Sequence, residues 1–310
     1  MKILICGSGS IATRHFKNLI KIGYKDIIFY KSTKYLKKNS IIKNKKIYYN
    51  LKEALREKPD ISFICNATNM HVDTAIKCAQ KKCHIFMEKP ISNNFKNINK
   101  LKQILKKNKL VFFVGYMMKF HPLVKKIKSI VNNNKSKNFF YASTIWGEFL
   151  PNWHPEENYK KSYAANKNQG GGVTLTLSHE LDLMIYLFGK IKSLTNKKKF
   201  KSKLKINADV ASTYLIQFLS GIDCNIHVNY LCNPPVRELV ILGENIQINF
   251  NYYLSILIVN EKNKIRKYSV KKFDRNQLFE EELKNFFKII KNKKKFNLEN
   301  EFYSLSYLIK

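Results

Sequence analysis

A glycine pattern behind the first apolar run constrains the fold of this chain more than any other feature. Residues 2–6 are typical of a short buried strand, and Gly7, Gly9 and Ala12 follow it at the start of a helical pattern. In such a turn the first glycine permits a tight bend, the second lets the backbone approach a pyrophosphate, and the alanine keeps strand and helix close. The helix N-terminus favours the anion. The residues predicted to bind a dinucleotide here are Gly7, Ser8, Gly9, Ser10, Ile11 and Ala12.

The first third of the chain continues this alternation of strand and helix patterns. Short apolar runs typical of strands lie at 2–6, 26–30, 46–49, 61–66, 85–87 and 111–114. Strands separated by helical stretches of roughly 10–15 residues indicate βαβ units and a parallel sheet. The sequence therefore predicts an α/β chain whose residues 1–120 form a Rossmann domain with a doubly wound parallel sheet.

After residue 120 the pattern changes to long β-rich runs. These runs lie at 139–149, 208–231 and 237–259, with hairpin signals at Ser220-Gly221 and Gly243-Glu244-Asn245. Helices are expected over 123–131, 178–188, 276–291 and 301–309, and a solvated loop over the lysine-rich 196–203. We predict a C-terminal α+β domain, residues 121–310, with one large open, mainly antiparallel sheet.

The charge of the chain does not indicate a nucleic-acid partner. The formal net charge of the 310 residues is +35, but lysines are spread along the whole sequence and Asn and Ile are abundant as well. This joint excess is typical of an AT-rich genome, and no aromatic–basic RNA motif or zinc finger accompanies it. Neither nucleic acid nor a membrane is expected as partner. A positive field would still attract an anionic substrate.

The cysteines and the apolar segments indicate a reduced, cytoplasmic setting. The six cysteines have neither CxxC nor zinc spacing, so no metal site is expected. No apolar stretch is long enough to span a bilayer, and the N-terminus lacks the pattern of a signal peptide.

The end of the second strand bears on the choice of cofactor. NAD-specific sites usually carry an acid here, bonded to the ribose hydroxyls, whereas this chain has Lys31, Ser32 and Thr33. A cation and two hydroxyls suit a 2′-phosphate and favour NADP. Lys31 also fits the general lysine excess, so NAD stays open.

Three motifs together resemble the Gfo/Idh/MocA family of sugar and inositol oxidoreductases. They are the glycine turn at 7–12, Glu-Lys-Pro at 88–90, and the glycines at 170–172 followed by His179 and Asp182. The resemblance extends over nearly the whole chain, including the segments 67–71 and 115–122. The stretch 153–172 resembles a branch of the family linked to surface-polysaccharide sugars.

The resemblance implies roles for individual residues. Lys89 would lie between the nicotinamide and the reacting hydroxyl, where an ammonium polarises a carbonyl or stabilises an alkoxide. His179 would move the hydroxyl proton, work that suits an imidazole near neutral pH. Asp182 would either orient His179 or form a salt bridge between the domains. The further cofactor contacts that the resemblance implies are Ala67, Thr68, His71 and Glu88.

One position departs from the family pattern. Many relatives carry an aspartate three or four residues before the histidine, where this chain has Leu175 and Thr176. Threonine forms hydrogen bonds but cannot act as a carboxylate, so a proton relay would lack its acid. The candidate substrate contacts are Lys89, Lys119, His121, Trp153, Tyr163, Thr176, His179 and Asp182.

These observations predict an NADP-preferring oxidoreductase. It would move a hydride between nicotinamide and a secondary alcohol or ketone of a sugar, sugar nucleotide or cyclitol. The apolar outer face of the second sheet would form a homodimer or homotetramer. Two alternatives stay open: a non-catalytic NAD(P)-binding sensor of the same fold, and an NAD-assisted glycosidase or lyase, which would consume no net cofactor.

Overall fold

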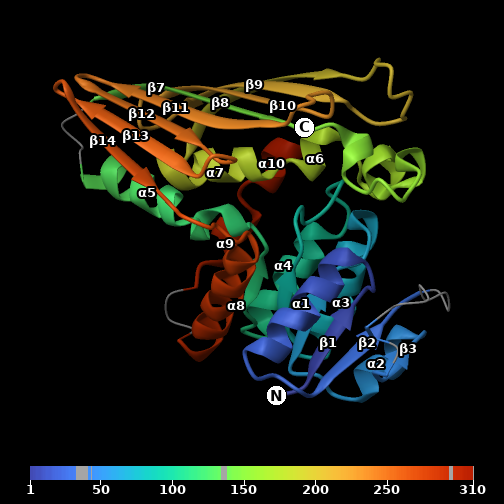
Figure 1. The fold of residues 1–310 in the computed structure, drawn as a ribbon. Coiled ribbons are helices and arrows are strands. Elements are labelled where there is room, and N and C mark those ends of the chain that lie inside the picture. Colours follow the sequence, from blue (N-terminus) through green and yellow to red (C-terminus); the bar gives the residue numbers. More distant parts are fainter. Residues whose placement is uncertain (33–40, 43, 134–137, 293–295, 310) are drawn as a thin grey trace. The chain divides into compact units, whose positions relative to one another are not determined.

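Two units make up the part of the chain that the computed structural model describes, residues 1–32, 41–42, 44–133, 138–292 and 296–309. The first unit consists of Met1–Tyr116 with Phe279–Lys310, and the second of Met117–Leu278 (Figure 1). The expected division near residue 120 lies close to the first boundary. The C-terminal end differs, because the prediction assigned residues 279–310 to the second domain.

The first unit contains a six-stranded parallel sheet in the order β3-β2-β1-β4-β5-β6. Its strands are β1 (Ile3–Cys6), β2 (Ile27–Tyr30), β3 (Ile47–Tyr48), β4 (Ile61–Ile64), β5 (His84–Met87) and β6 (Phe112–Val114). Its helices are α1 (Ser10–Lys21), α2 (Leu51–Arg56), α3 (His71–Gln80) and α4 (Ile98–Lys107), joined by α9 (Leu298–Phe302), α10 (Leu305–Leu308) and most of α8 (Asn276–Lys291). The strand order reverses beside β1, which confirms the predicted doubly wound sheet and places a switch point at the glycine turn.

The C-terminal helices belong to the first unit because they complete its core. The Phe286 ring of α8 lies 5.4 Å from Phe86 of β5 and 5.9 Å from Phe63 of β4. Phe302 of α9 stacks on Phe112 of β6 at 4.8 Å. A parallel sheet must be covered on both faces, and these aromatic contacts supply part of that cover. Helical periodicity predicted α8 but not the unit on which it packs.

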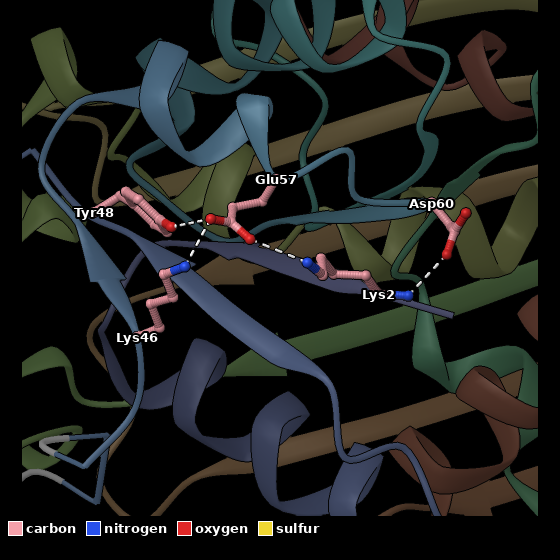
Figure 2. Close-up of polar contacts among 5 residues, drawn as sticks. All are labelled: Lys2, Lys46, Tyr48, Glu57 and Asp60. Atoms are coloured by element: carbon pink, nitrogen blue, oxygen red, sulfur yellow. Dashed lines mark hydrogen bonds and ion pairs between the residues drawn. The ribbon is translucent and has the colours of Figure 1, made fainter.

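Charged side chains hold the amino edge of this sheet together (Figure 2). Glu57, at the end of α2, accepts hydrogen bonds from Lys46 and Lys2, with N–O distances of 2.7 and 3.0 Å. The Tyr48 hydroxyl of β3 donates to the same carboxylate, and Asp60 accepts the backbone N–H of Lys2 at 2.7 Å. These contacts lower the pKa of Glu57 to about 2, with the Lys46 hydrogen bond as the largest cause.

The second unit contains an eight-stranded sheet in the order β14-β13-β12-β11-β7-β10-β9-β8. The strands are β7 (Phe139–Gly147), β8 (Ile191–Lys199), β9 (Ala211–Phe218), β10 (Asp223–Asn229), β11 (Val236–Gly243), β12 (Ile246–Asn251), β13 (Ile256–Glu261) and β14 (Lys264–Ser269). The β7–β10 pair is parallel and the other pairs are antiparallel. Helices α5 (Pro122–Asn133), α6 (Val173–Thr176) and α7 (His179–Phe188) lie along one face (Figure 1). The predicted open, mainly antiparallel sheet is confirmed.

The two edge strands of this sheet, β8 and β14, were not predicted from the sequence. The segment 196–203 was expected to be a loop, but residues 196–199 belong to β8, which pairs with β9. β14 was not predicted either. Both strands are rich in lysine and largely exposed, so they lack the alternation of apolar residues from which a half-buried strand is predicted. In the described part of the chain, no helix is long and apolar enough to cross a membrane.

Candidate active site

The glycine turn after β1 has the geometry that a pyrophosphate site needs. Gly7 has φ of 126°, and a Cβ there would lie 2.6 Å from the carbonyl oxygen of Cys65. A Cβ on Gly9 would meet none of the described atoms within 4 Å, so the space before the first turn of α1 is open. Ala12 is fully buried. This part of the chain therefore fits a dinucleotide, whose phosphates would approach Gly9 and the N-terminus of α1.

Lys31 lies beside this turn. The Gly7 N–H donates to the Tyr30 carbonyl at 2.8 Å, and the Lys31 N–H donates to Tyr48 at 3.0 Å. The Lys31 side chain is buried, which lowers the pKa of its ammonium group, and Ser32 is exposed. Thr33 lies outside the described residues.

The loop after β4 is tied to the loop after β5 by His71. Its Nδ1 lies 2.9 Å from the Pro90 carbonyl oxygen and its Nε2 lies 2.9 Å from the Asn66 carbonyl oxygen. Burial lowers the pKa of His71, although the two carbonyls oppose the shift. Thr68 is buried and Ala67 is half-buried beside it. His71 therefore positions two loops, and its predicted contact with a cofactor stays a prediction.

Lys89 stands at the carboxyl end of β5, directly after a buried carboxylate. Glu88 Oε1 lies 2.6 Å from His15 Nε2, and Glu88 Oε2 accepts the backbone N–H of Lys89 at 3.3 Å. His15 belongs to α1 and is fully buried, with its ring centroid 4.9 Å from Phe86 and 5.5 Å from Phe63. The Lys89 side chain is half-buried, and the Lys89–Pro90 peptide bond is cis. One buried pair thus joins the helix behind the glycine turn to the Lys89 loop.

His179 begins α7 in the second unit. It is buried, and its ring centroid lies 6.0 Å from that of Trp146 on β7. One helical turn later, Asp182 Oδ1 forms an ion pair of 2.9 Å with Lys119 Nζ. Burial raises the pKa of Asp182, while the nearby Lys119 lowers it. Asp182 therefore forms a salt bridge, which lies within the second unit because the boundary in the structure places Lys119 there rather than in the first domain.

Thr176 bonds to a tyrosine where many relatives have an acid. Its Oγ1 donates to the Gly172 carbonyl at 2.8 Å and also forms a short hydrogen bond with the Tyr230 hydroxyl. Tyr230 is fully buried, which raises the pKa of its phenol well above the usual value. The Trp153 ring meets Tyr230 edge-on at 5.3 Å. Two predicted substrate contacts, Thr176 and Trp153, therefore share one buried tyrosine.

An aspartate that the sequence interpretation missed fixes the glycine segment. Asp209 accepts hydrogen bonds from the backbone and the hydroxyl of Thr174, at 2.8 and 2.6 Å. Gly172 has φ of 100°, and a Cβ there would lie 1.9 Å from Asp209 Oδ1. The third glycine is therefore required by this carboxylate.

Two other predicted substrate contacts differ in exposure. His121 is fully buried; its Nδ1 accepts the Leu123 N–H at 3.2 Å and its ring lies 4.5 Å from Phe273. Burial, with a smaller contribution from Arg237, lowers the pKa of His121 to about 4. Tyr163 is 44% exposed. Tyr163 thus has surface for a ligand, whereas His121 packs as a core residue.

Next to His179, a buried ion pair was also missed. Glu180 is 1% exposed and accepts hydrogen bonds from Arg237 Nε at 2.6 Å and Thr144 Oγ1 at 3.1 Å. The Arg237 guanidinium stacks 3.8 Å from the Trp146 ring centroid and 4.8 Å from that of Tyr252. The available signal was a second acid, besides Asp182, in the first turn of a helix whose other residues after His179 are apolar or aromatic.

An open glycine turn at the switch point of a parallel sheet is typical of dinucleotide-binding proteins of the Rossmann class. The chain belongs to the Gfo/Idh/MocA family. The family model described as an oxidoreductase family with an NAD-binding Rossmann fold matches residues 1–116. The model of the GFO/IDH/MocA C-terminal domain matches residues 126–249. The resemblance seen in the motifs is thereby confirmed.

Curated relatives include an inositol dehydrogenase and an uncharacterized oxidoreductase. A myo-inositol 2-dehydrogenase of Thermotoga maritima is 30% identical over 61% of this chain and 55% of its own length. An uncharacterized oxidoreductase of Bacillus subtilis is 30% identical over 60% of this chain and 53% of its own. The matched part of the chain thus spans about half the length of these two relatives.

Solved structures share the whole fold. A levoglucosan dehydrogenase in complex with NADH and levoglucosan has a TM-score of 0.86 at 14% identity, covering 100% of this chain and 95% of its own. A UDP-N-acetylglucosamine 3-dehydrogenase of Acidithiobacillus ferrooxidans has a TM-score of 0.79 at 14% identity, with coverage of 100% and 95%. At this identity the likeness shows the fold alone.

Proposed function

We propose that this protein is an NADP-preferring oxidoreductase that moves a hydride between nicotinamide and a secondary alcohol or ketone of a sugar, sugar nucleotide or cyclitol. The observation that carries the proposal is the position of Lys89, at the carboxyl end of β5 and directly after the buried Glu88. Ligands of open α/β sheets bind at this edge. Relatives named as inositol and levoglucosan dehydrogenases support the sugar-type substrate.

In the proposed reaction, Lys89 and His179 have complementary roles. The Lys89 ammonium stabilises negative charge on the reacting oxygen as the carbonyl forms or disappears. His179 accepts the hydroxyl proton during oxidation and returns it during reduction. When bound, the nicotinamide accepts or donates the hydride. The Trp146 ring, which lies beside His179, limits the access of water to the imidazole.

The preference for NADP is supported by Lys31 and Ser32, which stand where an acid would bind the ribose of NAD. The Lys31→Asp variant should therefore bind NADH more tightly than NADPH, the reverse of the unaltered protein. Fluorescence titration of both cofactors measures this order. Tighter NADH binding by the unaltered protein would remove the argument.

Assembly as a homodimer or homotetramer is part of the proposal. Ile145, Leu215 and Val240 alternate with buried neighbours and so lie on the face of the second sheet that is turned away from the helices. Leu215 is 59% exposed. Association through this face would cover these side chains, and light scattering should report at least a dimer at micromolar concentration.

The decisive experiment is a turnover screen of NADPH and NADH against a panel of sugars, nucleotide sugars, keto-sugars and cyclitols. The proposal predicts net cofactor turnover with at least one of them. Catalysis without net consumption of cofactor would instead identify the NAD-assisted lyase or glycosidase.

The sensor alternative is favoured by one observation, the threonine at 176 in place of an acid. Cofactor binding in the absence of any turnover across the whole panel would support it.

A further inference from the structure

A cavity in the second unit has no role in the function proposed so far. It has a volume of about 410 Å³, is partly open to solvent, and is lined by the ends of several strands and the segment after β14. The lining residues that matter are Trp146, Glu148, Arg237, Tyr253, Lys272 and Arg275. Cavities of this size hold small ligands in proteins.

The charge of this lining is positive. Glu148 is the acidic residue among the described lining residues, and its Oε1 already accepts hydrogen bonds from Trp146 Nε1 at 3.0 Å and the Tyr253 hydroxyl at 2.7 Å. Lys272 and Arg275 are exposed, and neither forms an ion pair with a described residue. Lys272, Arg275 and Arg237, the last of which is paired with Glu180, therefore line the cavity together with one carboxylate, Glu148, whose Oε1 is occupied.

Arg237 adds a buried donor to the cavity. Its side chain is 5% exposed; Nε donates to Glu180 Oε1 at 2.6 Å, and Nη2 forms an ion pair with the same oxygen. Among the described residues, the buried Nη2 has no hydrogen-bond acceptor. A guanidinium presents five N–H donors in a planar fork that suits phosphate and carboxylate groups. The donors left over by Glu180 therefore fit an oxyanion.

One side chain joins the cavity to the candidate catalytic residue. The Trp146 ring lies 3.8 Å from the Arg237 guanidinium carbon and 6.0 Å, centroid to centroid, from His179. We propose that the cavity binds an oxyanion, a phosphate or carboxylate group, of the substrate whose hydroxyl His179 serves. This inference rests on the proposed function and narrows its substrates to anionic sugars.

Equilibrium binding tests the cavity without requiring turnover. Two anions, UDP and D-glucuronate, and the neutral probe D-glucose are each titrated into the protein by calorimetry. Excess NADPH is present throughout, so that the cofactor occupies the glycine turn and the probes cannot bind there. We expect saturable binding of UDP or of D-glucuronate and none of glucose. Lys272→Gln and Arg275→Gln should each weaken that binding about tenfold, because each removes a charge-assisted contact.

Lys271→Gln is the matched control. Lys271 is an exposed neighbour with the same charge, but it does not line the cavity, so the affinity should change less than twofold. Preferential binding of UDP would identify a phosphate substrate, and of glucuronate a carboxylate substrate. The inference is overturned if neither anion binds, or if the three variants weaken binding equally.

Failure of this inference is distinguishable from failure of the proposed function. Turnover of neutral sugars without oxyanion binding would remove the subsite and leave the oxidoreductase. Oxyanion binding that depends on Lys272 and Arg275 supports the subsite whatever the turnover screen finds.

Discussion

Each of the two candidate catalytic residues is next in sequence to a buried glutamate, and the partners of these glutamates differ. Glu88, before Lys89, pairs with the imidazole of His15, whereas Glu180, after His179, pairs with the guanidinium of Arg237. Both partners pack against aromatic rings. A guanidinium stays charged and presents a planar fork of donors, whereas an imidazole offers one ring nitrogen to the carboxylate. The first unit thus uses an imidazole–carboxylate pair, and the second a permanent ion pair.

The difference between the two glutamate pairs shows how Lys89 and His179 are held in position. Lys89 follows a strand end, where the Glu88–His15 contact ties its loop to α1. His179 lies on a helix, where the Glu180–Arg237 contact ties α7 to β11. A buried charge without its partner is costly, so the permanent pair should be the more sensitive to loss of one member.

The largest expected effect is the loss of turnover when Lys89 or His179, the neighbours of the two glutamates, is replaced. Lys89→Ala should lower kcat by about 10²–10³ and His179→Ala by about 10²–10⁴, because one stabilises charge and the other moves a proton. NADPH affinity should change little. Their double variant should lose less than the product of the two effects, since both serve one transition state. Near-normal kcat in both single variants would make the assigned roles wrong.

The second effect tests the permanent pair. Arg237→Met should lower the free energy of unfolding by about 3–5 kcal/mol, because Glu180 is left charged and buried. Urea denaturation measures the loss. The double variant Glu180→Gln/Arg237→Met should recover part of it. A single variant within 1 kcal/mol of the unaltered protein would contradict a buried ion pair.

The third effect tests the pair that includes an imidazole. Glu88→Gln keeps the size of the side chain and an acceptor for His15 but replaces a charge-assisted hydrogen bond by a neutral one. The expected loss in unfolding free energy is about 1 kcal/mol. The same urea titration compares it with Arg237→Met. An equal or larger loss for Glu88→Gln would erase the distinction between the two glutamates.

The smallest effect belongs to a half-buried glutamate, Glu57, at the amino edge of the first sheet. Its pKa in the folded protein is about 2, below the ordinary 4.5, mainly because Lys46 donates to it. Its stabilising contribution is therefore present above about pH 4.5 and is lost as the pH falls toward 2. Glu57→Gln should flatten the decline of stability between these values. An unchanged acid profile would show that the cluster contributes nothing measurable.

The sequence predicted the features that depend on local pattern. The glycine turn, the parallel strands of the first unit and α8 all follow from residue types at fixed spacing. The glutamate pairs do not, because His15 and Glu88 are 73 residues apart and Glu180 and Arg237 are 57 apart. Spacing alone does not reveal which distant side chains meet in a core. Asp209 was missed for the same reason, since Thr174 lies 35 residues before it.

The lysines on the edge strands β8 and β14 have a consequence for how the chain avoids fibrils. An open sheet leaves backbone N–H and C=O groups unpaired along both rims, where another chain can add a strand. Lys197 and Lys199 on one rim and Lys264 and Lys267 on the other would bring like charges together in any strand added from a second copy. The excess of lysine in this chain thereby gives the sheet electrostatic protection at the two places where polymerisation would begin.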